Sequence, residues 1–180
     1  SYGAADFVSW FDGHPDVPRT WPLEAQSTAV IGNGNVALDV ARMLVKHAED
    51  LLPTEIPDNV HAGLAASPVT DVHIFGRRGP AQVKFTPLEL RELGDLRDVD
   101  MVVYDEDFDY DEASKAAIAS NKQVMVIDRA LQSWRKLDSV NNAGGSASRR
   151  LHLHFYAKPV EVKKDADGRD KPDQPGHDEL

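Results

Sequence analysis

Apolar residues recur along the chain at two spacings, one typical of β-strands and the other typical of α-helices. The β-branched run 27–31 predicts a short strand that ends at Gly32. From residue 35 to about residue 48, apolar side chains fall on one face of a helix. The run 69–75 predicts the next strand, so this half of the chain has the strand–helix–strand order of a parallel unit.

The second half continues the alternation. Thr86 is a suitable N-cap for a helix that runs through Leu93, because Glu89 follows three residues later. Strands alternating with helices predict an α/β fold, a Rossmann-like doubly wound domain around a central, mainly parallel sheet. The other elements expected here are a strand at 101–104, helices at 111–120 and 121–137, and a strand at 151–156 that 159–162 extends.

Several segments interrupt this order. Residues 4–11 predict a short amphipathic helix, which the glycine and prolines after it terminate. The segment 51–68 predicts a loop with one helical turn near its C-terminal end. The run 141–148, rich in Gly, Ser and Asn, predicts another loop, and 165–180 predicts an acidic loop or tail.

The composition is that of a globular domain and excludes several kinds of site, but it does not indicate a particular function. The 180 residues are 41% hydrophobic and 28% charged, as in ordinary globular domains. The chain has no cysteine, which excludes disulfides, thiolate metal sites and cysteine nucleophiles. It has neither an apolar run long enough to span a bilayer nor a signal-peptide pattern, so we expect no membrane insertion.

The net charge of −10 is unevenly distributed. Residues 95–112 carry −8 and residues 165–180 carry −4, so the other 146 residues carry +2. The acidic balance argues against a nucleic-acid partner, which requires a basic face. It does not argue against an anionic cofactor elsewhere on the chain.

The most informative motif is a G-x-G-x-x-A run that follows a predicted strand and opens a predicted helix. Gly32 allows the tight turn, Gly34 lets a pyrophosphate approach the backbone, and Ala37 lets the helix pack closely on the strand. The free N–H groups at the helix N-terminus then face the phosphates. The residues expected to bind a dinucleotide here are Gly32, Asn33, Gly34, Asn35, Val36 and Ala37.

The end of the second strand indicates which dinucleotide is bound. NAD sites place an Asp or Glu there, whereas this chain has Arg77 and Arg78. Two guanidinium groups beside the ribose suit a 2′-phosphate, so NADP(H) is favoured over NAD. The distance of 43 residues from Gly34 to Arg77 exceeds the usual ~20, and an insertion over about 49–70 accounts for the excess.

Taken together, the blocks 32–42, 76–82 and 85–93 closely resemble the adrenodoxin-reductase-type ferredoxin–NADP reductases. Block 32–42 alone would also fit glutamate synthase small subunits. Blocks 76–82 and 85–93 favour the reductases over those subunits. Members of the reductase family contain FAD, take a hydride from NADPH and pass electrons singly to a ferredoxin-type iron–sulfur protein. Their FAD domain is built from both ends of the chain, with the NADP domain inserted between.

The resemblance implies that this chain is the inserted domain, inactive without the FAD domain. It has no second glycine fingerprint for FAD. Residues 1–25 would then be a connecting helix and linker, 26–164 the NADP(H)-binding domain, and 165–180 the acidic loop or tail. The expected location is the cytoplasm, or the mitochondrial matrix in a eukaryote.

The resemblance also implies roles for single residues. Asn35 and Val36 would bind the pyrophosphate, Arg77 and Arg78 the 2′-phosphate, and Glu89 would lie near the nicotinamide side of the cofactor.

Asp39 and Glu92 resemble the acidic groups of the catalytic centre that approach the FAD domain and a histidine there. Lys84 departs from the small residue expected at its position, which changes the charge beside the phosphate site.

Two other patterns could indicate metal binding. His152 and His154 alternate on one strand, but the sequence supplies no third ligand, so solvent-facing histidines are expected. The acidic run 105–112 lacks the calcium-loop pattern and predicts a solvated loop. No metal site is therefore predicted.

Two alternative functions stay open. The chain could be a non-catalytic Rossmann-like module whose acidic segments meet a basic partner. It could also be a fragment of a glutamate-synthase-like subunit, which would require cysteine-rich sequence upstream.

Overall fold

A computed structural model describes residues 1–140, 145–164 and 170–171. Its centre is a four-stranded sheet in the order β1-β2-β4-β3, and every neighbouring pair is parallel. The expected fold class is confirmed. The strands are β1 (Ser27–Ile31), β2 (Asp71–Phe75), β3 (Val99–Val103) and β4 (Arg149–His154).

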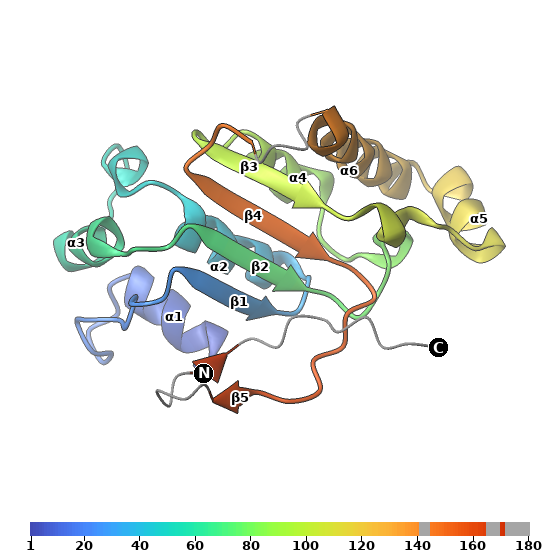
Figure 1. The fold of residues 1–180 in the computed structure, drawn as a ribbon. Coiled ribbons are helices and arrows are strands. Elements are labelled where there is room, and N and C mark those ends of the chain that lie inside the picture. Colours follow the sequence, from blue (N-terminus) through green and yellow to red (C-terminus); the bar gives the residue numbers. More distant parts are fainter. Residues whose placement is uncertain (141–144, 165–169, 172–180) are drawn as a thin grey trace.

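Helices join the strands, as parallel pairing requires. Figure 1 shows α2 and α4 behind the sheet and α6 beyond β3. The helices are α1 (Ala4–Phe11), α2 (Asn35–Val45), α3 (Asp58–Ala66), α4 (Pro87–Gly94), α5 (Glu112–Ser120) and α6 (Lys122–Val140). Short 3₁₀ turns are η1 (Ala48–Leu51), η2 (Pro80–Gln82) and η3 (Asp105–Phe108).

The two faces of the sheet differ in burial. Val72, Ile74, Leu151 and Leu153 are at most 1% exposed, because they belong to the core cluster that also contains apolar residues of α2, α4 and α6. Their neighbours in sequence point to the opposite face, since side chains alternate along a strand. Those neighbours are Asp71, His73, Phe75, His152 and His154, all only partly buried.

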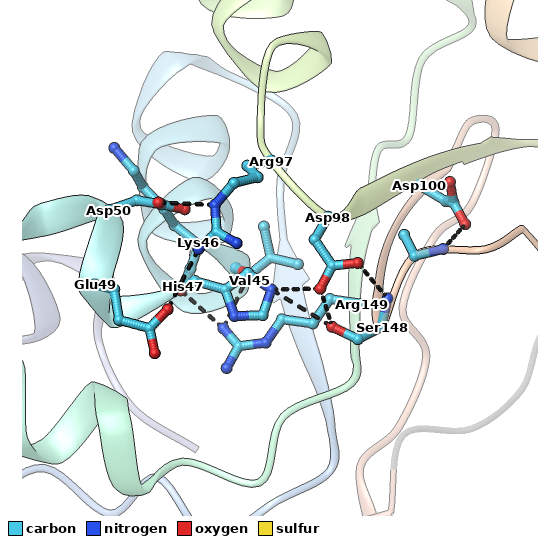
Figure 2. A network of polar contacts seen from close by, with 11 residues as sticks. Val45, Lys46, His47, Glu49, Asp50, Arg97, Asp98, Asp100, Ser148 and Arg149 are labelled. Atoms are coloured by element: carbon cyan, nitrogen blue, oxygen red, sulfur yellow. Dashed lines mark hydrogen bonds and ion pairs between the residues drawn. The ribbon is translucent and has the colours of Figure 1, made fainter.

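A polar network fixes the end of the sheet where β3 and β4 begin (Figure 2). Arg149 donates to the carbonyl oxygens of Val45 and Lys46 at 3.0 and 2.8 Å, which satisfies the C-terminus of α2. Asp98, with φ of 57°, accepts from the Ser148 N–H at 2.9 Å and lies 3.0 Å from His47 Nε2. These contacts hold α2 against the sheet from the end opposite the glycine loop.

The segment 51–68 is more helical than its sequence indicates. A nine-residue helix, α3, replaces the single turn that we expected. Val60 and Leu64, four residues apart, are 0% and 2% exposed and form its apolar stripe. So narrow a stripe gives a weak periodic signal.

The fourth strand ends earlier than expected. It stops at His154, and Tyr156 has φ of 53°, which turns the chain away from the sheet. Residues 159–162 do not extend it, and Val160 and Val162 are 92% and 63% exposed. The short antiparallel pair β5 (Lys163–Lys164) and β6 (Asp170–Lys171) follows. Most of the expected tail, and 141–144 of the expected loop, lie outside the described residues.

The acidic segment 105–112 is not wholly solvated, contrary to expectation. Asp107 is 8% exposed and accepts a hydrogen bond from the Phe155 N–H at 3.1 Å. Burial raises the pKa of Asp107 to about 6. Asp107 therefore fixes the position of Phe155, the residue that follows β4.

Candidate functional site

The loop between β1 and α2 has the backbone that its sequence predicts. Gly32 has φ of +115°, a conformation that side chains rarely adopt, and its N–H donates to Phe75 O at 2.8 Å. Gly34 is the N-cap of α2, which begins at Asn35 as expected. The N–H groups of the first helical turn have no intrahelical acceptors, so they are available to an anion.

The space in front of this loop is open. A Cβ atom on Gly32 or Gly34 would meet no atom within 4 Å. Ala37 is 9% exposed and packs within the core, so it brings α2 close to the strand. The loop therefore has both the room and the donors that a pyrophosphate requires.

Arg77 and Arg78 follow β2 on an exposed turn that the chain after β4 fixes from one side. The Ala157 N–H donates to Gly76 O at 2.9 Å, and the Tyr156 N–H donates to Arg78 O at 3.4 Å. The Tyr156 ring lies against Gly79, where a Cβ would be 2.0 Å from its hydroxyl oxygen. These contacts set the direction of the turn that carries the two arginines.

Asn33 closes the space between the two turns. Its side chain lies against Gly76, where a Cβ would be only 2.1 Å from Asn33 Nδ2. Nδ2 is buried and has no hydrogen-bond partner among the described residues. Asn33 also lines the open groove, so a turn of its side chain would bring this donor to a ligand acceptor.

Both turns line one groove of about 590 Å³. Lys84 lines it as well, and the three cations Arg77, Arg78 and Lys84 form no ion pair with other described residues. Unpaired cations converging on one groove of an acidic chain favour an anionic ligand. The groove is lined by Ile31, Gly32, Asn33, Gly34, Phe75, Arg77, Arg78, Gln82, Lys84 and Pro159.

Glu89 connects the start of α4 to the start of α2. One of its carboxylate oxygens accepts from the Thr86 N–H at 3.1 Å, which confirms the predicted capping box. The other accepts from Asn35 Nδ2 at 3.3 Å. Glu89 therefore lies beside the N-terminus of α2, although it does not line the groove.

Asp39 and Glu92 are brought together by a residue that the sequence analysis did not single out. Arg42 lies 3.0 Å from a carboxylate oxygen of Asp39 and 3.3 Å from one of Glu92. The Asp39 and Glu92 side chains are 49% and 45% exposed. Asp39 and Arg42 are three residues apart on a helix, a spacing that predicts an ion pair from the sequence alone.

The groove also includes residues without a recognisable motif. Gln82 and Pro159 line it, and Tyr156 shapes its arginine turn. In the sequence, Lys84 stands out only as a departure from the family pattern. Pro159 and Tyr156 come from the far end of the chain, so no local pattern could have placed them.

Known proteins match nearly all of the chain. It is 38% identical over 166 residues to the NADPH-ferredoxin reductase FprA of Mycobacterium tuberculosis, covering 91% of this chain and 35% of that protein. It is 36% identical over 172 residues to the mitochondrial NADPH:adrenodoxin oxidoreductase of Bos taurus, covering 93% of this chain and 35% of the relative. The chain is homologous to part of the adrenodoxin-reductase-type ferredoxin–NADP reductases.

The solved structures agree with this assignment. Mycobacterium tuberculosis FprA in complex with NADPH matches with a TM-score of 0.79 and 33% identity, covering 97% of this chain and 41% of that chain. The chain thus spans about a third of the length of the curated reductases that it matches. No protein-family model matches it. Among the described residues, no helix is both long and apolar enough to cross a bilayer.

Proposed function

We propose that the chain is the NADP(H)-binding part of a flavin-dependent ferredoxin–NADP reductase. The observation that carries this proposal is the convergence of the glycine loop and the cations Arg77, Arg78 and Lys84 on one groove. The name of the solved relative, FprA in complex with NADPH, supports the same ligand. A nicotinamide cofactor bound here supplies a hydride, and this chain's part is to hold and orient that cofactor.

Two observations support the proposed binding roles, the position of the α2 N-terminus after the glycine loop and the cations that line the groove. The N–H groups of Asn35 and Val36, at the start of α2, would bind the pyrophosphate. Arg77 and Arg78 would bind the 2′-phosphate, with Lys84 as a third cation that the motif does not require. Asn33 Nδ2, buried without a partner among the described residues, would donate to the same ligand.

The acidic residues outside the groove would serve the reaction rather than the binding of phosphate. Glu89, beside Asn35, would lie on the nicotinamide side of the cofactor. Asp39 and Glu92 would face the FAD domain, and Arg42 would hold both carboxylates in place. We propose residues 1–25 as the connection to that domain and 26–164 as the NADP(H) domain, with 165–180 as an acidic tail.

The whole protein would belong to an electron-transfer chain. We infer FAD as its second cofactor and a ferredoxin-type iron–sulfur protein as its electron acceptor, because the relatives are named ferredoxin and adrenodoxin reductases. Its location would be cytoplasmic or mitochondrial, and some relatives are named mitochondrial.

Calorimetric titration with NADP⁺ tests the binding proposal. Replacing Arg77 by Ala removes a charge-assisted contact worth roughly 1.5–3 kcal/mol, so the affinity should fall about 10- to 100-fold. Arg91→Ala is the matched control, because Arg91 is exposed on α4 and lines a different hollow, between α4 and α6. An Arg77→Ala affinity equal to that of the control would overturn the 2′-phosphate assignment.

A further inference from the structure

The face of the sheet opposite the helices brings together histidines that are far apart in sequence. β2 and β4 pair in parallel with His73 directly opposite His152, and Asp71 lies two residues before His73 on the same face. His152 Nε2 is 3.0 Å from Asp71 Oδ1, and the His73 and His152 rings stack with centroids 4.1 Å apart. The histidines of β4 are therefore partly buried among other residues, and the expectation of solvent-facing side chains was wrong.

We propose that Asp71, His73 and His152 form a binding site for a divalent transition-metal ion such as Zn²⁺. One ligand atom from each of the three lies within 4.8 Å of the other two. Two imidazole nitrogens and a carboxylate oxygen are donors that zinc favours, at bond lengths of about 2.0–2.2 Å. Tetrahedral geometry at such bond lengths separates donor atoms by roughly 3.3 Å. His152 Nε2 and Asp71 Oδ1, 3.0 Å apart, are already close to that separation. The His73 and His152 rings are stacked with an interplanar angle of 14°, so His73 must turn out of the stack before both rings can direct a nitrogen at one ion.

The second nitrogen of each histidine already has a partner. His152 Nδ1 lies 3.0 Å from the Tyr104 hydroxyl, and His73 Nδ1 lies 3.0 Å from His154 Nε2. Metal-binding histidines are commonly oriented by a hydrogen bond at the nitrogen that does not bind the ion. Tyr104 and His154 would have this orienting role, and the ion would take the place of the contact between His152 Nε2 and Asp71 Oδ1.

Arg150 is the charged neighbour that limits the affinity. It donates to both oxygens of Asp71, at 2.6 and 3.0 Å. The ion must therefore share this carboxylate with a guanidinium group. We expect weaker binding than at closed four-ligand zinc sites, with the fourth coordination position taken by water.

Titration of tag-free, chelator-treated protein with Zn²⁺ tests the site. We expect one ion per chain in the wild type and at least tenfold weaker binding in His73→Gln and in His152→Gln. His154→Phe keeps an aromatic ring beside His73 but removes the nitrogen that contacts His73 Nδ1. The affinity of this variant for Zn²⁺ should therefore fall by about tenfold. His14→Gln, an exposed histidine outside the sheet, is the control and should bind as the wild type does.

A measurement on the unmodified chain covers the case in which a variant does not fold. Histidine ring ¹⁵N resonances should shift on addition of Zn²⁺ at His73 and His152, and not at His14. Absence of saturable one-to-one binding would overturn the proposal. Shifts confined to other histidines, or equal affinities in folded His73→Gln and the control, would overturn it too.

Discussion

Two glycines of the same loop serve different purposes. Gly32 has φ of +115°, a backbone conformation that a residue with a side chain would adopt only under strain. Gly34 has φ of −93°, which any residue can adopt, and a Cβ there would point into open space. None of the described residues therefore requires glycine at position 34, and we attribute it to the ligand proposed for this loop.

Alanine substitutions should separate these two roles. Gly34→Ala should cost no more than about 1 kcal/mol of stability, because alanine is a poorer N-cap than glycine but meets neither strain nor a clash here, yet it should weaken NADP⁺ binding at least tenfold. Gly32→Ala should cost about 1–3 kcal/mol of stability, since it strains the backbone. Denaturant unfolding and calorimetry measure the two quantities. Wild-type NADP⁺ affinity in Gly34→Ala would contradict a pyrophosphate at this loop.

Lys84 should contribute to cofactor selection as well as to affinity. It is exposed, lines the groove with Arg77 and Arg78, and has no ion-pair partner among the described residues. Lys84→Ala should therefore weaken NADP⁺ binding about three- to tenfold and leave NAD⁺ binding unchanged, with a smaller effect at high salt. Equal losses for both nucleotides would assign Lys84 to a part of the cofactor other than the 2′-phosphate.

At the scale of elements, the direction of the turn after β2 depends on the path of residues 155–157, which follow β4. Phe155 donates to the buried carboxylate of Asp107 on η3, and Tyr156 then turns onto Gly79. These contacts of the segment after β4 fix the turn that carries Arg77 and Arg78. Asp107, an acidic residue that the sequence predicted in a solvated loop, thus supports the turn that lines a basic groove.

The raised pKa of Asp107 makes this contact dependent on pH. Its pKa is about 6 in the folded chain and near 3.8 when unfolded, so the folded state binds the proton more tightly. The cost of burying the ionised group is present above pH 6 and is relieved as the pH falls from 6 toward 4. That relief should stabilise the wild type by roughly 1–3 kcal/mol relative to Asp107→Asn. Denaturant unfolding of both proteins between pH 7 and 4.5 measures it, and a constant difference would contradict the burial of this charge.

The sequence predicted those parts of the molecule that depend on neighbouring residues. The glycine loop, the capping box of Thr86 and Glu89, and the four parallel strands all arise from short patterns. Contacts between distant residues were missed. His73 and His154 are 81 positions apart, and only the pairing of β2 with β4 brings them together. The contact of Tyr156 with Gly79 likewise requires the end of β4 to be known.

The whole-molecule charge is compatible with an anionic cofactor because the acidic segments and the groove are separate parts of the chain. Residues 95–112 carry −8, yet none of them lines the groove, where three cations converge. Screening over about 8–10 Å at physiological salt reduces the influence of more distant acids. The local cations should therefore determine which nucleotide binds.

Calorimetric comparison of NADP⁺ with NAD⁺ on the unmodified chain tests the central claim most directly. The two nucleotides differ only in the 2′-phosphate, so the ratio of their Kd values reports the contribution of Arg77, Arg78 and Lys84. Charge-assisted hydrogen bonds of roughly 1.5–3 kcal/mol predict that NADP⁺ binds at least tenfold more tightly. Equal Kd values, or tighter binding of NAD⁺, would contradict the assignment of this groove to NADP(H).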